Sequence, residues 1–93
     1  MIKTFKCKET EKIFSRNYSK KLPNDIQRAA FRKLRMIDRS KSLTDLKIPP
    51  ANRLKMLSGR RKGQYSIRIN DQWRICFKWV DNNALEVEIT DCH

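Results

Sequence analysis

Residues 59–77 read GRRKGQYSIRINDQWRICF, and this stretch decides the fold. Apolar and polar residues alternate over residues 65–69, which is the period of a β-strand with one covered face. Residues 70–72 are typical turn residues, and residues 73–80 have the composition of a second strand. The stretch therefore predicts an antiparallel hairpin that follows a basic turn at residues 59–63.

The alternation divides the first of these strands into two faces. Its apolar residues, at positions 65, 67 and 69, are expected to pack on helices. Ser66, Arg68 and Asn70 share the other face. A polar sheet face that carries an arginine beside a basic turn and a basic loop predicts a positively charged concave surface, which suits an RNA backbone.

A further strand is predicted at residues 85–90, after turn residues at 81–83. Its alternation places Leu85, Val87 and Ile89 toward the core, with Glu86, Glu88 and Thr90 pointing outward. The C-terminal third of the chain therefore reads as consecutive antiparallel strands joined by short turns.

The residues before these strands predict two helices. Residues 2–6 alternate and predict a short strand, and residues 8–22 predict an amphipathic helix. Asn24 can cap a second helix, whose apolar residues recur every three or four positions. These residues are Ile26, Ala29, Ala30, Leu34 and Ile37. Residues 40–53 predict a long loop, and residues 54–56 a short strand.

Together these elements predict an α+β fold, in which two N-terminal helices pack on a twisted antiparallel β-sheet. The 93 residues are enough for one small domain, spanning residues 1–93. Three scattered cysteines and the lack of an apolar leader or membrane-spanning run predict a cytoplasmic protein with reduced thiols. The sole histidine is His93, so we expect no metal site and no cofactor.

Charge narrows the class of partner. The chain carries 22 Lys and Arg against 10 Asp and Glu, a net charge of +12. Residues 1–63 alone hold 19 basic and 5 acidic side chains. A basic field of this density attracts polyanions and acidic proteins, and makes their binding sensitive to salt.

The stretch at residues 59–77 resembles the signature of the HigB, or killer protein, branch of the RelE/ParE toxin superfamily. The opening IKTFKCK, the second helix with its loop, and the ending EITDCH resemble the same family. The resemblance implies the toxin of a type II toxin–antitoxin system, a metal-independent endoribonuclease that cuts messenger RNA on the ribosome. It also implies a helix-turn-helix antitoxin of the HigA type, through which the pair contacts its operator DNA.

Metal-free cleavage of RNA needs charge stabilisation on the phosphate and proton transfer at two oxygens. Arg74 matches a family arginine at the active site, and Arg68, on the polar sheet face, is the second candidate. The resemblance assigns the acid–base role to the chain end, where Asp91 and His93 are the candidates. A structural alternative for Arg74 is an ion pair with Glu86 or Glu88.

Six further residues are candidates for RNA binding. They are Lys55, Arg60, Arg61, Lys62, Asn70 and Cys92. Four positions depart from the family pattern. Lys55 replaces a histidine, Ser58 a lysine, Arg60 an aspartate and Cys92 a tyrosine. Two alternatives therefore stand beside the ribonuclease: a ParE-like poison of DNA gyrase, and a weak or inactive toxin that acts mainly by binding its antitoxin.

Overall fold

The predicted strands form one antiparallel sheet in the computed structural model, which describes residues 1–91. The strands follow one another in the order β1-β2-β3-β4. They are β1 (Lys55–Met56), β2 (Gln64–Arg68), β3 (Trp73–Val80) and β4 (Asn83–Asp91). Asp81 and Asn82 both have positive φ (51° and 62°), the conformation of the tight turns that join twisted hairpin strands. The hairpins predicted from residues 64–91 are confirmed.

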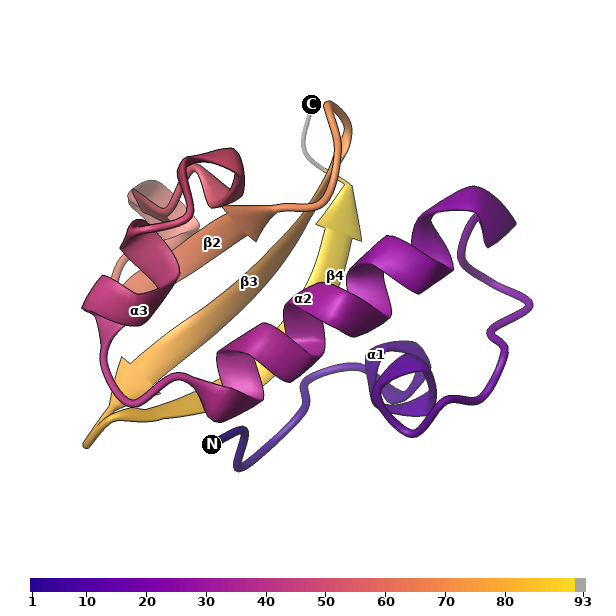
Figure 1. The fold of residues 1–93 in the computed structure, drawn as a ribbon, viewed down its shortest axis with the longest axis horizontal. Helices are drawn as coiled ribbons and strands as arrows, with labels where there is room; N and C mark the ends of the chain where they lie inside the picture. Colours follow the sequence, from indigo (N-terminus) through magenta and orange to yellow (C-terminus); the bar gives the residue numbers. More distant parts are fainter. Residues whose placement is uncertain (92–93) are drawn as a thin grey trace.

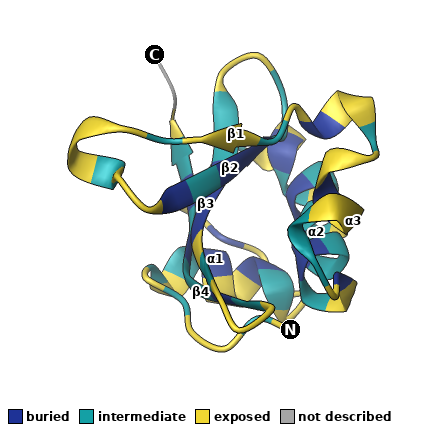
Figure 2. Ribbon diagram, turned by 90° about the vertical axis from the view of Figure 1, so that its left-hand side faces the viewer, coloured by how far each residue is buried: buried dark blue, intermediate teal, exposed yellow. Residues whose placement is uncertain are grey.

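Helices lie on one face of this sheet (Figures 1 and 2). They are α1 (Lys8–Phe14), α2 (Gln27–Arg39) and the short α3 (Leu43–Lys47). Single 3-10 turns occur at η1 (Asn24–Ile26), η2 (Pro50–Asn52) and η3 (Gly59–Arg61). The predicted α+β fold, two N-terminal helices on an antiparallel sheet, is confirmed. Within residues 1–91, no helix has the length and apolar character needed to cross a bilayer.

The first helix is shorter than predicted. It ends at Phe14 rather than at residue 22, because Arg16 adopts a left-handed conformation (φ 65°) that breaks the helix. The connection that follows is fixed by Ser19, a buried residue whose backbone N–H donates to Gln27 Oε1 at 3.1 Å. The predicted cap is also wrong, since Asn24 opens the turn η1 and makes no side-chain cap hydrogen bond.

The long loop predicted for residues 40–53 is wrong, because it contains α3 and η2. Ser42 and Asp45 form a capping box at the start of α3. The Asp45 carboxylate accepts backbone hydrogen bonds from Lys41 at 2.8 Å and Ser42 at 3.3 Å. Leu46 is fully buried and anchors this short helix in the core. Sequence reasoning passed over the Ser-x-x-Asp pattern that signals such a helix start.

The core lies between α2 and the sheet. The predicted stripe on α2 supplies Ile26, Ala30, Leu34 and Ile37, all buried, whereas Ala29 is only half-buried. The inward apolar residues of the first hairpin are confirmed. Ile67 is buried opposite Ile75, and Tyr65 stacks on Phe77 with ring centroids 6.3 Å apart.

One inward residue of β4 was assigned to the wrong face. Cys76 pairs with Glu88, but Lys78 pairs with Leu85, so β4 holds one extra residue between these pairs. Glu86 adopts φ 52° at this β-bulge, and the bulge reverses the alternation. Ala84 and Val87 therefore face the core, while Leu85 lies on the face of Lys78.

The N-terminal residues pair with the outer edge of β4. Isolated parallel bridges join Ile2 to Ala84 and Phe5 to Val87, so the predicted strand at residues 2–6 is reduced to two bridges. The Lys3 N–H donates to Ala84 O at 2.8 Å, and the Val87 N–H donates to Thr4 O at 3.1 Å. This segment covers an edge that other chains can otherwise extend.

Thr10 connects α1 to β4 through a buried hydrogen bond. Its Oγ1 accepts the backbone N–H of Ile89 at 2.9 Å, and the residue is fully buried. Replacing it by valine leaves that N–H buried without an acceptor. We expect Thr10→Val to lower the free energy of unfolding by about 1–3 kcal/mol in urea denaturation. The exposed Thr44→Val is the control, and equal losses in the two variants would contradict this role.

Candidate active site

The face of the sheet opposite α2 carries the polar residues, arranged in rows across the strands. Lys55 of β1 pairs with Ser66, Ser66 with Cys76, and Cys76 with Glu88. In the next row, Arg68 pairs with Arg74 and Arg74 with Thr90. Side chains at paired positions lie on the same face, about 5 Å apart at Cβ.

The register therefore brings Arg68 and Arg74 together on adjacent strands. Two like charges directly opposite each other destabilise a sheet. Arg68 offsets part of this repulsion through an ion pair with Asp71, whose carboxylate is exposed in the β2–β3 turn. An anion held between the two guanidinium groups would remove the repulsion, so the pair is suited to a phosphate.

Arg74 is held by neutral oxygens. Its Nε donates to Ser66 Oγ at 2.7 Å, and its Nη2 donates to Arg53 O at 2.7 Å and to Ser66 O at 3.3 Å. Glu86 and Glu88, the suggested partners, pair instead with Lys78 at 2.6 Å and Arg61 at 2.9 Å. Within residues 1–91, Arg74 thus keeps its charge uncompensated by a carboxylate.

The Arg53 carbonyl is set in place by the buried residue that precedes it. Asn52 is fully buried, and its Nδ2 donates to Leu46 O at 3.0 Å. Lys33 Nζ of α2 donates to Asn52 Oδ1. Arg53 then adopts a left-handed conformation (φ 45°), which turns its carbonyl toward Arg74. Asn52 therefore connects α2 and α3 to the arginine of the candidate site.

Lys33 lies close enough to this site to sense its charge. Partial burial lowers the pKa of Lys33, and the positive charges of Arg32 and Arg68 lower it further. Lys33 and Arg68 come from opposite faces of the sheet, so their coupling marks the sheet end near Arg68 as a concentrated positive field.

The basic turn gives its three charged residues different roles. Arg60 and Lys62 are exposed, as RNA-binding residues would be. Arg61 donates to Gln64 Oε1 at 3.2 Å and pairs with Glu88 on the outer face of β4. Gly59, the first residue of η3, and Gly63, two residues beyond its end, have φ of 64° and 90°, a conformation that other residues rarely adopt. Arg61 thus folds the turn onto the sheet.

Two other predicted residues lie at opposite edges of the candidate site. Lys55 is exposed on the short edge strand β1, in the row next to Arg68 and Arg74. Asn70 has a structural function, since its Oδ1 accepts the backbone N–H of Gln72 at 2.9 Å and of Trp73 at 2.7 Å. It shapes the turn that follows Arg68.

Asp91, the predicted acid–base residue that the structure describes, does not lie beside the arginine pair. Asp91 ends β4 opposite Trp73, and its carboxylate accepts from Gln72 Nε2 at 3.0 Å. Strand alternation puts Asp91 on the other face from Thr90 and Arg74, at the same end of the sheet. Cys92 and His93 lie outside the described residues.

Sequence reasoning missed Ser66, Asn52 and Thr90 as parts of this site. Ser66 is fully buried, and its hydroxyl accepts a hydrogen bond from Arg74. Thr90 is half-buried and stands opposite Arg74 on β4. The sequence placed Ser66 on the polar face but could not predict its hydrogen bond with Arg74, because that contact depends on the pairing of β2 with β3. Asn52 stands in a stretch read as a loop, where nothing in the sequence indicates burial.

Comparisons with known proteins agree on one family. A family model for "RelE-like toxin of type II toxin-antitoxin system HigB" matches residues 3–93. Toxin HigB-1 of Vibrio cholerae serotype O1 is 44% identical over 82 residues, which are 87% of this chain and 86% of that protein. Endoribonuclease HigB of Proteus vulgaris is 31% identical over 94 residues, with 100% of both chains covered.

Solved structures share the fold. The YoeB-YefM complex from Staphylococcus aureus contains a chain that is similar with a TM-score of 0.61, covering 100% of this chain and 98% of that chain. A heterotetrameric YoeB-YefM toxin-antitoxin complex from the same organism matches equally well. The sequence identity is 20% in both cases, so this likeness concerns the fold alone.

Proposed function

The chain belongs to the HigB-like family of RelE-like toxins and is therefore an endoribonuclease toxin of a type II toxin–antitoxin system, and we propose that it cuts messenger RNA on the ribosome, in the cytoplasm, without a metal ion. The observation that carries this proposal is the cross-strand pair of Arg68 and Arg74. Guanidinium groups match the oxygens of a phosphodiester, and these two arginines stand at directly opposed positions on adjacent strands.

In the proposed reaction, the 2′-oxygen of the RNA attacks the adjacent phosphorus while the bond to the 5′-oxygen breaks. A base removes the 2′-proton, and an acid protonates the leaving 5′-oxygen, which leaves a cyclic phosphate and a 5′-hydroxyl. Arg74 and Arg68 stabilise the extra negative charge on the phosphorane. Ser66 and the Arg53 carbonyl hold the Arg74 fork in one orientation, so little reorganisation is needed during the reaction.

Asp91 and His93 are the proposed acid–base residues. Asp91 lies at the sheet end that also carries the arginine pair, although on the opposite face of β4. A substrate that crosses this end of the sheet can contact both. Lys55, Arg60, Lys62 and Cys92 are proposed to bind the RNA on either side of the cut, and Arg61 and Asn70 to shape that surface.

An antitoxin is a partner of this toxin, in keeping with the toxin–antitoxin complexes among its structural neighbours. We propose that it is a helix-turn-helix protein of the HigA type, which brings the pair to operator DNA. The net charge of +12 favours rapid, salt-sensitive binding of an acidic partner.

The two alternatives are not favoured by these findings. A poison of DNA gyrase has no need of facing arginines, and an endoribonuclease is among the relatives. A weak toxin was suggested by the changes at Lys55, Ser58 and Cys92, but the arginine pair does not depend on those positions.

The proposed substrate is tested by mapping 5′ ends of cellular messenger RNA after a short pulse of toxin expression without antitoxin. We expect new ends within translated frames, absent when translation initiation is blocked beforehand. Ends that also appear in untranslated RNA would overturn the dependence on the ribosome. Growth arrest without new ends would favour gyrase poisoning, and no arrest would favour a weak toxin.

The cysteine at position 92 tests whether the chain end contacts a base. We expect Cys92→Tyr to raise the cleavage rate in a ribosome assay several-fold, because an aromatic ring stacks on a base and a thiol does not. Cys92→Leu, which adds apolar bulk without a ring, is the control. Unchanged cleavage by the tyrosine variant would remove this position from the proposed base-stacking surface.

A further inference from the structure

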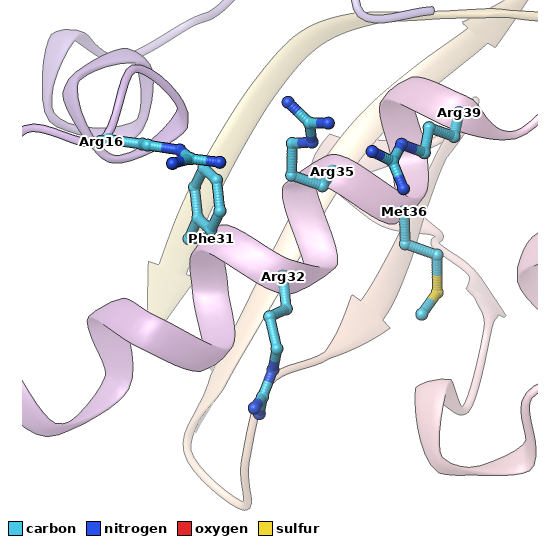
Figure 3. A pocket seen from close by; sticks show the side chains of 6 residues that line it. All are labelled: Arg16, Phe31, Arg32, Arg35, Met36 and Arg39. Carbon is cyan, nitrogen blue, oxygen red and sulfur yellow. The ribbon is translucent and has the colours of Figure 1, made fainter.

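The side of α2 that does not pack on the sheet carries a second cluster of arginines (Figure 3). A shallow hollow of about 520 Å³ lies along this helix. We call its lining the α2 arginine surface, made of Arg16, Phe31, Arg32, Arg35, Met36 and Arg39. Arg32, Arg35 and Arg39 stand on neighbouring turns and span about 10 Å of helix axis.

No carboxylate neutralises this surface. Within residues 1–91, none of its four arginines forms an ion pair, and α2 holds only one acidic residue, Asp38. Asp38 is engaged by the N-terminus, since its Oδ1 accepts the Ile2 N–H at 2.9 Å. Arg16 lies 5.1 Å from the centroid of the Phe31 ring, which orders its guanidinium over the hollow.

An aromatic side chain extends the same surface. A second hollow of about 750 Å³ adjoins the first, and both are lined by Arg16 and Phe31. Tyr18, 61% exposed, lines this second hollow together with Arg28. Arginines that bind phosphates beside an exposed aromatic ring that stacks on a base are the usual components of an RNA-binding surface.

The α2 arginine surface and the candidate active site lie on opposite sides of the core. The apolar side of α2 packs on the sheet, and Arg68 and Arg74 project from the sheet's other face. At one end of α2 the two sites approach each other, because the charges of both Arg32 and Arg68 lower the pKa of Lys33.

The geometry points to a second RNA-binding site on the α2 arginine surface, which takes the phosphate backbone of RNA and one unpaired base. This inference deepens the proposed function, on which it rests for its biological context. An acidic peptide is the less favoured ligand, because the Phe31 ring already lies under Arg16. The phosphates belong either to the ribosome or to the messenger strand.

The test compares two variants of equal net charge. One replaces Arg32, Arg35 and Arg39 by glutamine, and the control replaces the exposed Lys3, Lys6 and Lys8 by glutamine. Binding of each is measured to purified small ribosomal subunits, to a single-stranded 2′-O-methyl oligonucleotide that has no nucleophile for cleavage, and to the antitoxin. Cleavage is not required, so a failure of the proposed reaction does not affect this result.

We expect the arginine variant to bind RNA at least tenfold more weakly than the control, with a salt dependence less steep by about two charges. A loss confined to ribosomal subunits identifies ribosomal RNA as the ligand, and a loss that includes the oligonucleotide identifies the messenger strand. Equal RNA affinity in the two variants overturns the site. A loss of antitoxin affinity alone also overturns it, in favour of an acidic protein ligand.

Discussion

Arg74→Ala is expected to abolish growth arrest and to lower ribosome-dependent cleavage by about 10²–10³-fold. The substitution removes the fork that is proposed to hold the phosphorane, together with its hydrogen bonds to Ser66 and Arg53. Cleavage is measured in single-turnover conditions on purified ribosomes that carry a defined message. A variant that arrests growth like the parent would show that Arg74 does not act in the reaction.

Two controls separate chemistry from folding in this experiment. Arg74→Lys keeps the charge but loses the fork, and we expect it to retain part of the activity. Antitoxin binding by Arg74→Ala should remain near that of the parent. Its thermal midpoint should fall only slightly, because the end of the charge repulsion with Arg68 offsets the hydrogen bonds lost to Ser66 and Arg53 O. Loss of all three properties together would mean that Arg74 mainly supports the sheet.

Asn52→Ala is expected to reduce both stability and activity. The change leaves Leu46 O and Lys33 Nζ without their hydrogen-bond partner, at a cost of about 2–3 kcal/mol in the free energy of unfolding. It also releases the loop that presents the Arg53 carbonyl to Arg74. Denaturant unfolding measures the first effect, and kcat at low temperature, where the variant is folded, measures the second.

The link from Asn52 to Arg74 is tested by a double-mutant cycle. In an Arg74→Lys background, which has no guanidinium fork to orient, Asn52→Ala should lower kcat less than it does in the parent. The exposed Asn17→Ala should change stability by less than about 0.5 kcal/mol and is the control. Equal reductions of kcat in both backgrounds would mean that Asn52 stabilises the fold without positioning Arg74.

The sheet was predictable because one side of it is buried against helices. Strict alternation over residues 65–69, with turn residues after it, predicts the strand, the face that each side chain occupies and the hairpin that follows. Leu85 was misplaced because a bulge depends on which residues pair across two strands, and alternation alone carries no sign of it. The register that places Arg68 opposite Arg74 likewise becomes known only once the β2–β3 turn is defined.

The candidate site was predictable for residues whose side chains project from regular strands. Alternation placed Arg68 on the polar face, the family resemblance identified Arg74, and the structure brings the two positions together. Asn52 was not identified, because its role depends on burial between α2 and α3, which are distant in sequence from the arginines. Residues that support a site through a loop leave no periodic pattern in the sequence.

The bridges between residues 2–5 and β4 have a consequence for the order of folding. They join residues 2 and 5 to residues 84 and 87, so they close a long loop. Contacts of such separation form late, because the entropy of loop closure is lost before the contact contributes. β4 is synthesised after β3, so β3, which carries Arg74, gains its second neighbour only once β4 has emerged. The arginine pair therefore reaches its final setting only after β4 has paired with β3 and with the N-terminal segment.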